Sequence, residues 1–170
     1  VRTSSTGRVI GLTLNDFTVD SGVTVAKVAQ AFLISDSDDV QINDPYIRLD
    51  ASLGSSGIRF DGTCVNGSVN GGFISGADFG TLAKNTSAVN IRNTIYKSQG
   101  SYGIYAADTS TVFENQNRIS LAGISALFKD AGATLRAMNW QAYTPVFSTD
   151  IGNAAASFSG AVTVNLARFS

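Results

Sequence analysis

The acidic side chains are the residues of this sequence that could most readily do chemistry. There is one glutamate, Glu114, and there are twelve aspartates. Enzymatic cleavage of a glycosidic bond commonly uses two carboxylates, one on either side of the bond. Glu114 and Asp108 form the candidate catalytic pair, although Asp108 also suits a turn in which its side chain bonds the neighbouring backbone. Because carboxylates are few outside such turn-like contexts, the sequence favours a protein without enzymatic activity.

Other common catalytic and metal-binding groups are missing from the sequence. It has no histidine, which excludes Ser-His-Asp chemistry and ordinary zinc sites, and Cys64 is its only cysteine. A lone thiol without a histidine base is expected to be a small buried side chain rather than a nucleophile. The acidic run from Asp36 to Asp39 lacks the EF-hand pattern and is interpreted as a solvated turn. We therefore expect neither a metal site nor a cofactor.

Charge and hydropathy limit the possible partners. The 12 basic and 13 acidic residues are mixed along the chain, and the net charge is −1. A nucleic-acid-binding surface needs a basic stripe, and a membrane-spanning helix needs about 18 apolar residues in a row. The sequence has neither, so we expect no nucleic-acid partner and no membrane insertion. Because Val1 is not a natural start residue, we expect the chain to be a piece of a longer one.

A repeat of about 23 residues organises the sequence. Seventeen glycines, many short polar residues and only two prolines indicate short strands joined by tight turns. Within this composition, a small residue opens a mostly apolar stretch at regular intervals. The six positions, with spacings of 24, 26, 23, 23 and 23 residues, are Gly7, Ala31, Gly57, Gly80, Gly103 and Ala126.

A column of amide and carboxyl side chains lies thirteen positions after these small residues. Asparagine tolerates the left-handed backbone conformation that a tight turn can demand, and its amide both donates and accepts hydrogen bonds. Turns that stack on one another would therefore place these side chains in line. The predicted turn column consists of Asp20, Asp44, Asn70, Asn93, Gln116 and Asn139.

Apolar columns complete the repeating unit. Apolar residues recur nine and sixteen positions after the small residues, for example at Val89 and Ile119, as expected where alternate side chains share one face. Three short strands per coil predict an all-β fold, a right-handed parallel β-helix of about six coils in which neighbours bury each other. This β-helix would span residues 1–140, with a β-structured extension or the start of a further domain at 141–170. A sandwich or barrel of hairpins is the alternative, but hairpins do not require a short polar side chain at a fixed offset.

The orientation of Glu114 has two interpretations. In the repeat it shares a column with Ile91, which points it inward, where a buried carboxylate is costly and has a raised pKa suited to an acid role. A slip of one residue would instead turn Phe113 inward and leave Glu114 in solvent beside an arginine. We prefer the slip, because it also puts Asn115 rather than Gln116 in the turn column.

The 23-residue coils, the asparagine-rich turn column and the β-rich tail resemble the β-helix of bacteriophage tailspikes and tail fibres. The same solenoid occurs in pectate-lyase-like proteins. The resemblance covers about residues 7–140 and is one of architecture. It implies a homotrimer in the virion tail, outside the cell, that recognises bacterial surface polysaccharide. Outward side chains would contact this glycan, and the candidates are Tyr105, Phe113 and Arg136.

The resemblance makes a structural and receptor-binding fragment of such a trimer the leading hypothesis. The first alternative is a polysaccharide depolymerase, a glycosidase or lyase on the same β-helix, that would use Glu114 and Asp108. The second alternative is a bacterial surface adhesin, which is more often monomeric.

A further column, two residues after the small residues, supports a trimer independently of the resemblance. If its neighbours face inward, this column faces outward, and an outward apolar stripe on a soluble protein usually marks an interface. The alternative is that the tail or a turn covers the stripe. Arg59 is the one polar member, and the predicted trimer interface consists of Val9, Leu33, Leu82, Tyr105 and Phe128.

Overall fold

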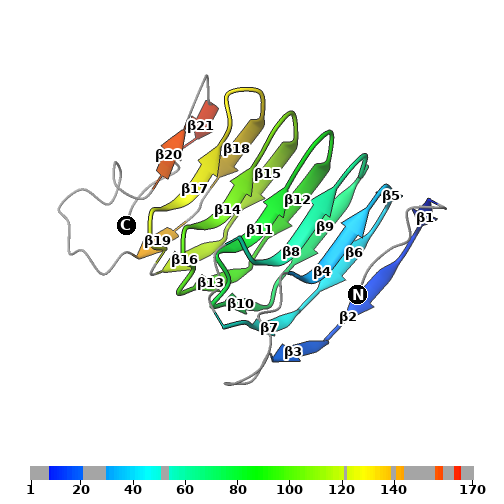
Figure 1. Cartoon of the computed structure of the whole chain (residues 1–170), viewed down its shortest axis with the longest axis horizontal. Coiled ribbons are helices and arrows are strands. Elements are labelled where there is room, and N and C mark those ends of the chain that lie inside the picture. Colours follow the sequence, from blue (N-terminus) through cyan, green and yellow to red (C-terminus); the bar gives the residue numbers. More distant parts are fainter. Residues whose placement is uncertain are drawn as a thin grey trace.

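The protein is an all-β solenoid built from parallel strands (Figure 1). The structure is a computed structural model that describes residues 8–20, 30–50, 54–120, 122–138, 141–143, 156–158 and 163–165. In these ranges every strand pair is parallel and no helix occurs. The predicted parallel β-helix is therefore confirmed, with about five turns where the repeat predicted about six.

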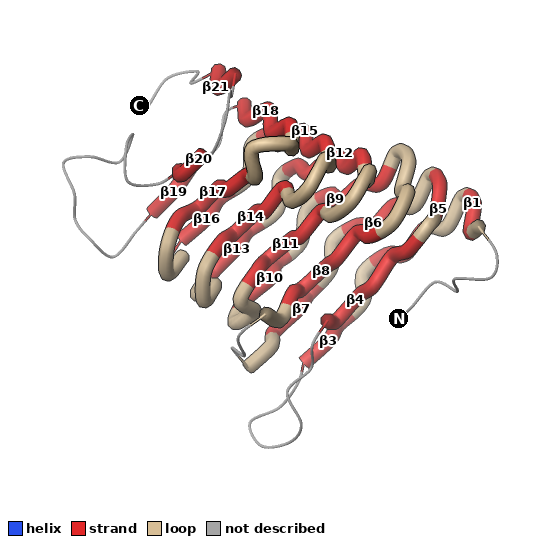
Figure 2. The backbone as a smooth tube through the Cα atoms, turned by 45° about the horizontal axis from the view of Figure 1, so that its top comes forward, coloured by secondary structure: helices blue, strands red, loops and turns tan. Residues whose placement is uncertain are grey.

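The chain winds through three sheets in turn, and successive turns stack their strands side by side (Figure 2). Sheet 1 consists of β4 (Gln30–Ser35), β8 (Ser56–Asp61), β11 (Phe79–Ala83), β14 (Tyr102–Ala106), β17 (Ser125–Lys129) and β20 (Ala156–Phe158). Sheet 2 consists of β2 (Thr13–Asn15), β6 (Gln41–Asn43), β9 (Gly67–Asn70), β12 (Ala88–Arg92), β15 (Thr111–Asn115), β18 (Thr134–Met138) and β21 (Thr163–Asn165). Sheet 3 consists of β3 (Thr18–Asp20), β7 (Tyr46–Arg48), β10 (Phe73–Ser75), β13 (Ile95–Lys97), β16 (Arg118–Ser120) and β19 (Gln141–Tyr143). A short extra pair joins β1 (Val9–Ile10) to β5 (Ser37–Asp38).

Alternate side chains of each strand face the interior, where they stack on their equivalents in the next coil. In sheet 3 the column Ile47, Ile74, Tyr96 and Ile119 is in register and at most 1% exposed. The hydroxyl of Tyr96 shares a hydrogen bond of 2.8 Å with Oγ1 of Thr81 from sheet 1, so this buried polar group is satisfied. No single coil could bury such a column, and stacking is what removes it from water.

The small-residue column that reveals the repeat lies in sheet 1. Gly57, Gly80, Gly103 and Ala126 occupy equivalent positions of four neighbouring strands. A Cβ atom at Gly80 would lie 2.4 Å from the carbonyl oxygen of Gly103 and 2.3 Å from a ring carbon of Tyr96. The periodic glycines therefore reflect the close approach of successive coils, which leaves no room for a side chain.

The corner between sheets 2 and 3 contains a column of residues in the left-handed backbone region. Among the predicted members, Asp44, Asn93 and Gln116 have φ angles of +49°, +56° and +58°. Asp16 and Gly71 complete the column, with φ angles of +48° and +69°. At each of these five positions the backbone N–H donates to a carbonyl oxygen of the following coil. Short polar side chains and glycine suit this conformation.

Two other predicted members of the turn column lie elsewhere. Asp20 ends a strand of sheet 3, because the first coil is offset by more residues than predicted: Leu14 pairs with Ile42, 28 positions later. Asn70 lies one position before the corner, because the third coil has one more residue between sheets 1 and 2 than the fourth. The predicted places of these two residues are taken by Asp16 and Gly71. Asn139 lies outside the described residues.

The predicted trimer column is found on the outer face of sheet 1, with one exception. Val9 does not belong to it, because β1 pairs with β5 and places Val9 opposite Ser37. The prediction was wrong there for the same reason as at Asp20, the longer offset of the first coil. The members that are in register are Leu33, Arg59, Leu82, Tyr105 and Phe128.

Strands from the predicted C-terminal extension add to the stack. β19 pairs with β16, β20 with β17 and β21 with β18, all in parallel. Each of the three sheets thus gains one strand beyond residue 140.

Candidate functional site

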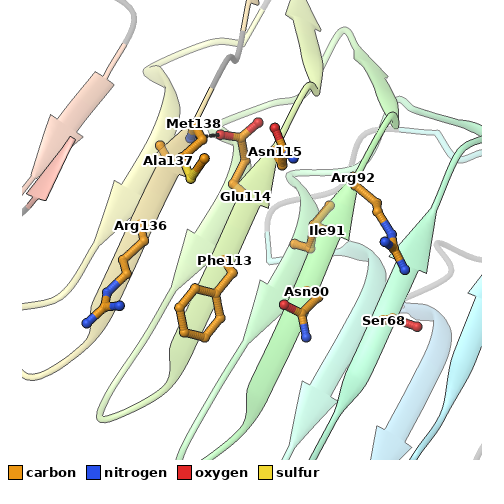
Figure 3. A pocket seen from close by; sticks show the side chains of 10 residues that line it. All are labelled: Ser68, Asn90, Ile91, Arg92, Phe113, Glu114, Asn115, Arg136, Ala137 and Met138. Atoms are coloured by element: carbon orange, nitrogen blue, oxygen red, sulfur yellow. Dashed lines mark hydrogen bonds between the residues drawn. The ribbon is translucent and has the colours of Figure 1, made fainter. Parts of the chain in front are cut away.

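A groove crosses the outer face of sheet 2 between two rows of side chains (Figure 3). Successive residues of a strand point to opposite faces, so the residues between the two rows face inward and their backbone forms the floor. The groove has a volume of about 560 Å³, within the range of about 300–1,000 Å³ typical of small-molecule sites. The first row is Ser68, Asn90, Phe113 and Arg136, and the second contains Arg92, Asn115 and Met138.

Phe113 presents an aromatic ring in the first row and is 40% exposed. The guanidinium carbon of Arg136 lies 5.5 Å from the centre of this ring, close enough for a cation–π interaction. Asn90 lies on the opposite side of Phe113 in the register, so an amide and a guanidinium flank the ring. An apolar surface bordered by hydrogen-bonding groups is the usual composition of a site that orients a small polar ligand.

Arg92 is held at the edge of the groove by a ladder of asparagine side chains. Its Nε donates to Oδ1 of Asn70 at 2.6 Å. Nδ2 of Asn70 donates in turn to Oδ1 of Asn43 at 2.7 Å, and Nδ2 of Asn43 donates to Oδ1 of Asn15 at 2.8 Å. The ladder orients the guanidinium through an amide, and among the described residues no carboxylate pairs with its positive charge.

Glu114 faces the interior, and the slip that we preferred from the sequence is wrong. The side chain is 1% exposed and lies in register between Ile91 and Ala137, whereas Phe113 is outside. Its Oε1 accepts hydrogen bonds from the backbone N and the Nδ2 of Asn117, at 3.1 and 2.9 Å, and its Oε2 accepts one from the backbone N of Met138 at 3.2 Å. Burial raises the pKa of Glu114 to about 7, although these three donors act in the opposite direction. The carboxyl group of Glu114 can be buried because hydrogen-bond donors from two coils bind its oxygens.

Asp108 lies in the corner between sheets 1 and 2 and is exposed. Its φ angle is +58°, its Oδ2 accepts a hydrogen bond from the backbone N of Asn85 at 3.1 Å, and its own N donates to Oδ2 of Asp130 at 3.0 Å. These contacts join three successive coils, as expected for an aspartate with a turn function. Because Glu114 points into the interior and Asp108 lies at an exposed turn, the two carboxylates do not flank one groove.

Tyr105 lies on a different face from the other two candidate glycan-binding residues. It belongs to an aromatic cluster on the outer face of sheet 1 with Phe79, Tyr102 and Phe128, all of them half-buried. The rings of Tyr102 and Phe128 are stacked, with centres 4.5 Å apart and planes 6° apart. The hydroxyl of Tyr105 donates to Oδ1 of Asp130 at 3.0 Å. The structure therefore brings Phe113 and Arg136 together and separates Tyr105 from them.

Several residues that line the groove, chiefly Asn90, Arg92 and Asn115, were not among the site residues predicted from the sequence. The available signal was alternation: since Ile91 is inward, its neighbours Asn90 and Arg92 must be outward. The Oδ1 of Asn115 is buried beside the groove, and the described residues provide it with no hydrogen-bond partner. It is an unsatisfied acceptor next to the candidate site.

Across the described ranges, no three acidic or thiol side chains are grouped to hold a metal ion, and no helix has the length and apolar character needed to span a membrane. Cys64 is buried, and its thiol donates to the carbonyl oxygen of Asp61 at 3.1 Å. Comparison of the chain with protein-family models, with curated proteins and with solved structures found no match.

Proposed function

We propose that this chain is a shaft segment of a trimeric phage tailspike or tail fibre and that its solenoid binds bacterial surface glycan. The observation that carries the proposal is the groove on sheet 2, where the exposed ring of Phe113 lies between the guanidinium of Arg136 and the amide of Asn90. A sugar ring has apolar C–H faces and polar hydroxyl edges, so an aromatic ring with flanking donors and acceptors complements both. The rows of the groove run from strand to strand along the stack, which suits a chain of sugars (Figure 3).

The stacked coils support the mechanical part of the proposal. Sheets of six, six and seven strands run along the solenoid, and each coil contacts its neighbours through continuous ladders of hydrogen bonds. A rod of this kind would hold a binding groove at a constant position on an extracellular virion tail.

The outer face of sheet 1 is the proposed contact between copies of the chain. Four half-buried aromatic rings gather there, at Phe79, Tyr102, Tyr105 and Phe128, whereas Leu82 of the same face is buried, with 5% of its surface exposed. Contiguous apolar surface on a soluble protein commonly marks an interface, and most oligomers of identical chains close by rotational symmetry. A homotrimer would bury this face and leave the groove on sheet 2 accessible.

Binding to immobilised bacterial polysaccharides tests the glycan part. Arrayed capsular polysaccharides and O-antigens would be probed with the purified chain and with Phe113→Ala. We expect the variant to bind at least about tenfold more weakly, the effect of losing about 1.4 kcal/mol of binding. Tyr46→Ala is the matched control, because Tyr46 is a similarly exposed aromatic residue (44%) on sheet 3. Equal binding by Phe113→Ala and the unaltered chain would contradict the proposal.

A polysaccharide depolymerase on the same β-helix is the second candidate, and the raised pKa of Glu114 is the observation that favours it. A carboxyl group with a pKa of about 7 is suited to act as a general acid. Catalysis would require the carboxyl group to leave its bonds to Asn117 and Met138 and reach the surface. New reducing ends, or the ultraviolet absorbance of an unsaturated product, would reveal turnover. Turnover that is abolished by Glu114→Gln and kept by Asp108→Asn would favour a Glu114-dependent enzyme.

A further inference from the structure

We infer that the groove on sheet 2 selects an acidic polysaccharide, one whose repeating unit carries carboxylate or sulfate groups. This inference rests on the proposed glycan-binding function and adds the chemical class of the ligand. It depends on the two arginines that border the groove, on what they contact and on how far apart they lie.

The surface of sheet 2 is positively charged around the groove. Arg92 and Arg136 both line it and are exposed. Within the strands of sheet 2 that the structure describes, Glu114 is the one acidic residue, and it faces the interior with both oxygens bound to donors. The corner residues nearest the second row in the fourth and fifth coils, Asn93 and Gln116, are uncharged. A ligand over these strands would therefore meet the positive charge of the two arginines, whereas the carboxylates of Asp108 and Asp130 lie in the other corner, between sheets 1 and 2.

Neither arginine is neutralised by a carboxylate within the described ranges. Four other basic side chains, Arg8, Arg48, Arg59 and Lys84, each pair with an aspartate. By contrast, Arg92 bonds the amide oxygen of Asn70 and Arg136 lies over an aromatic ring.

The remaining N–H groups determine what these arginines can bind. A guanidinium has five N–H donors in a planar fork, and one bond to Asn70 or one ring contact leaves most of them available. The fork matches the two oxygens of a carboxylate or sulfate.

The separation of the two arginines indicates that the ligand is a chain of several sugars rather than a single sugar. Arg92 and Arg136 lie on β12 and β18, with β15 between them, and are offset by two residues in the register. At about 4.8 Å between strands and about 3.3 Å per residue, their Cα atoms are roughly 12 Å apart. Phe113 on β15 lies between the two strands. A sugar on its ring would thus have acidic neighbours on both sides bound by the arginines.

The test compares acidic polysaccharides with their neutralised forms. Arrayed bacterial polysaccharides, neutral and acidic, would be probed with the purified chain, and each uronate-containing sample would also be presented after chemical reduction of its carboxyl groups. Each sulfated sample would be presented after desulfation, so the two arms distinguish carboxylate from sulfate. We expect the chain to bind acidic samples and to lose at least about tenfold in affinity when the acid is removed.

Charge-matched variants show whether the groove is responsible. The double variant Arg92→Gln, Arg136→Gln is expected to lose binding, and Arg136→Gln alone to weaken it. Arg136→Gln leaves intact the ladder of asparagine side chains to which Arg92 is hydrogen-bonded. The control is Arg48→Gln, Lys97→Gln, which removes the same charge from exposed positions of sheet 3.

Three outcomes would overturn the inference. Equal affinity for an acidic sample and its neutralised form would overturn the acidic specificity while leaving glycan binding in place. Equal losses in the groove variants and the sheet 3 control would show that overall charge, not the groove, attracts the ligand. Failure to bind any polysaccharide of the array would overturn both this inference and the proposed function.

Discussion

Glu114 connects two coils from inside the solenoid. Its oxygens accept hydrogen bonds from Asn117 within its own coil and from the backbone N of Met138 in the next coil. Tyr96 is a buried titratable group near enough for the charge of Glu114 to raise its pKa further. A negative charge at this position is thus opposed by burial and supported by three donors, and the balance depends on pH.

The stability of the protein is expected to fall between about pH 4.5 and pH 7 because of Glu114. The folded-state pKa is raised from 4.5 to about 7, so in this window the unfolded chain releases a proton that the folded chain retains. The free energy of unfolding therefore decreases as pH rises, by up to about 3 kcal/mol, and levels off above pH 7. Urea denaturation from pH 5 to pH 8 would measure the slope.

Glu114→Gln should remove this slope, because the side chain no longer titrates. Asp108→Asn is the control: it removes an exposed carboxylate from the turn that precedes β15 and tests whether the loss of any negative charge has the same effect. If Glu114→Gln retained the slope of the unaltered chain, Glu114 would not be its cause.

Asn117 satisfies several buried groups with one amide. It is fully buried, its Nδ2 donates to the carbonyl oxygen of Ile91 at 3.0 Å, and its Oδ1 accepts from the backbone N of Thr94 at 2.8 Å. Asn117→Ala would remove the side-chain partners of these two groups, each at a cost of about 1–3 kcal/mol, and would leave Oε1 of Glu114 with one donor, the backbone N of residue 117, in place of two. We expect a loss of about 4 kcal/mol in urea denaturation. Asn90→Ala, at an exposed position, should change stability by less than about 0.5 kcal/mol.

At the scale of the elements, sheet 1 sets the distance between coils. Its equivalent glycines pack backbone against backbone, and the interior column of sheet 3 packs against the same strands, as the contact that a Cβ at Gly80 would make with Tyr96 shows. The interior is close-packed, so added volume cannot be absorbed without moving a whole strand. The glycine column is consequently a constraint on the spacing of the stack.

Gly80→Ala is expected to destabilise the protein by about 3 kcal/mol, because its methyl group would overlap Tyr96 and the carbonyl of Gly103. Thermal unfolding followed by circular dichroism would measure the effect. Ala126→Gly makes the reverse change in the same column and removes a methyl group without any overlap, at a cost of about 1 kcal/mol. A Gly80→Ala protein as stable as the unaltered chain would show that the coils can separate to accept a side chain.

At the scale of the whole molecule, the three sheets present different outer faces. Sheet 1 carries the aromatic cluster and sheet 2 the polar groove with its two arginines. Sheet 3 carries a smaller apolar strip, in which the rings of Tyr46 and Phe73 stack with centres 5.4 Å apart and Ile95 follows in register. Because the three outer faces differ, one face can form the contact between copies of the chain while another binds the ligand.

The proposed trimer can be broken selectively from one of these faces. Phe128→Asp places a charge in the aromatic cluster of sheet 1, and burying it between copies would carry a large desolvation cost. Multi-angle light scattering is expected to give a trimer for the unaltered chain and for Tyr46→Asp on sheet 3, and a smaller species for Phe128→Asp. A stable monomer of the unaltered chain would contradict the trimer and favour the adhesin alternative.

The fold could be predicted from the sequence because each repeat of the sequence corresponds to one coil of the solenoid. Residues such as Val89, Ile104 and Gly80 recur about every 23 positions, and each satisfies its environment only when an equivalent residue lies above or below it. In a solenoid, residues one repeat apart in the sequence lie next to each other in neighbouring coils, so the period of the sequence specifies most of the contacts between coils. The pairing of Phe113 with Arg136, 23 positions apart, follows from the same rule.

Only the tertiary structure shows which coils are longer or shorter than the average repeat of about 23 residues. An extra residue in a turn leaves the local pattern of the strands intact, so neither the displacement of Asn70 nor that of Asp20 could be read from neighbouring residues. The inward position of Glu114 depends on donors from Asn117 and from the backbone of Met138, which only folding brings to it. Likewise, Arg92 and Arg136 border one groove because three strands are in register. The sequence pattern specifies which side chains prefer water. The hydrogen-bond partners that allow a polar side chain such as Glu114 to be buried come from separate coils, and only the packing of those coils brings them together.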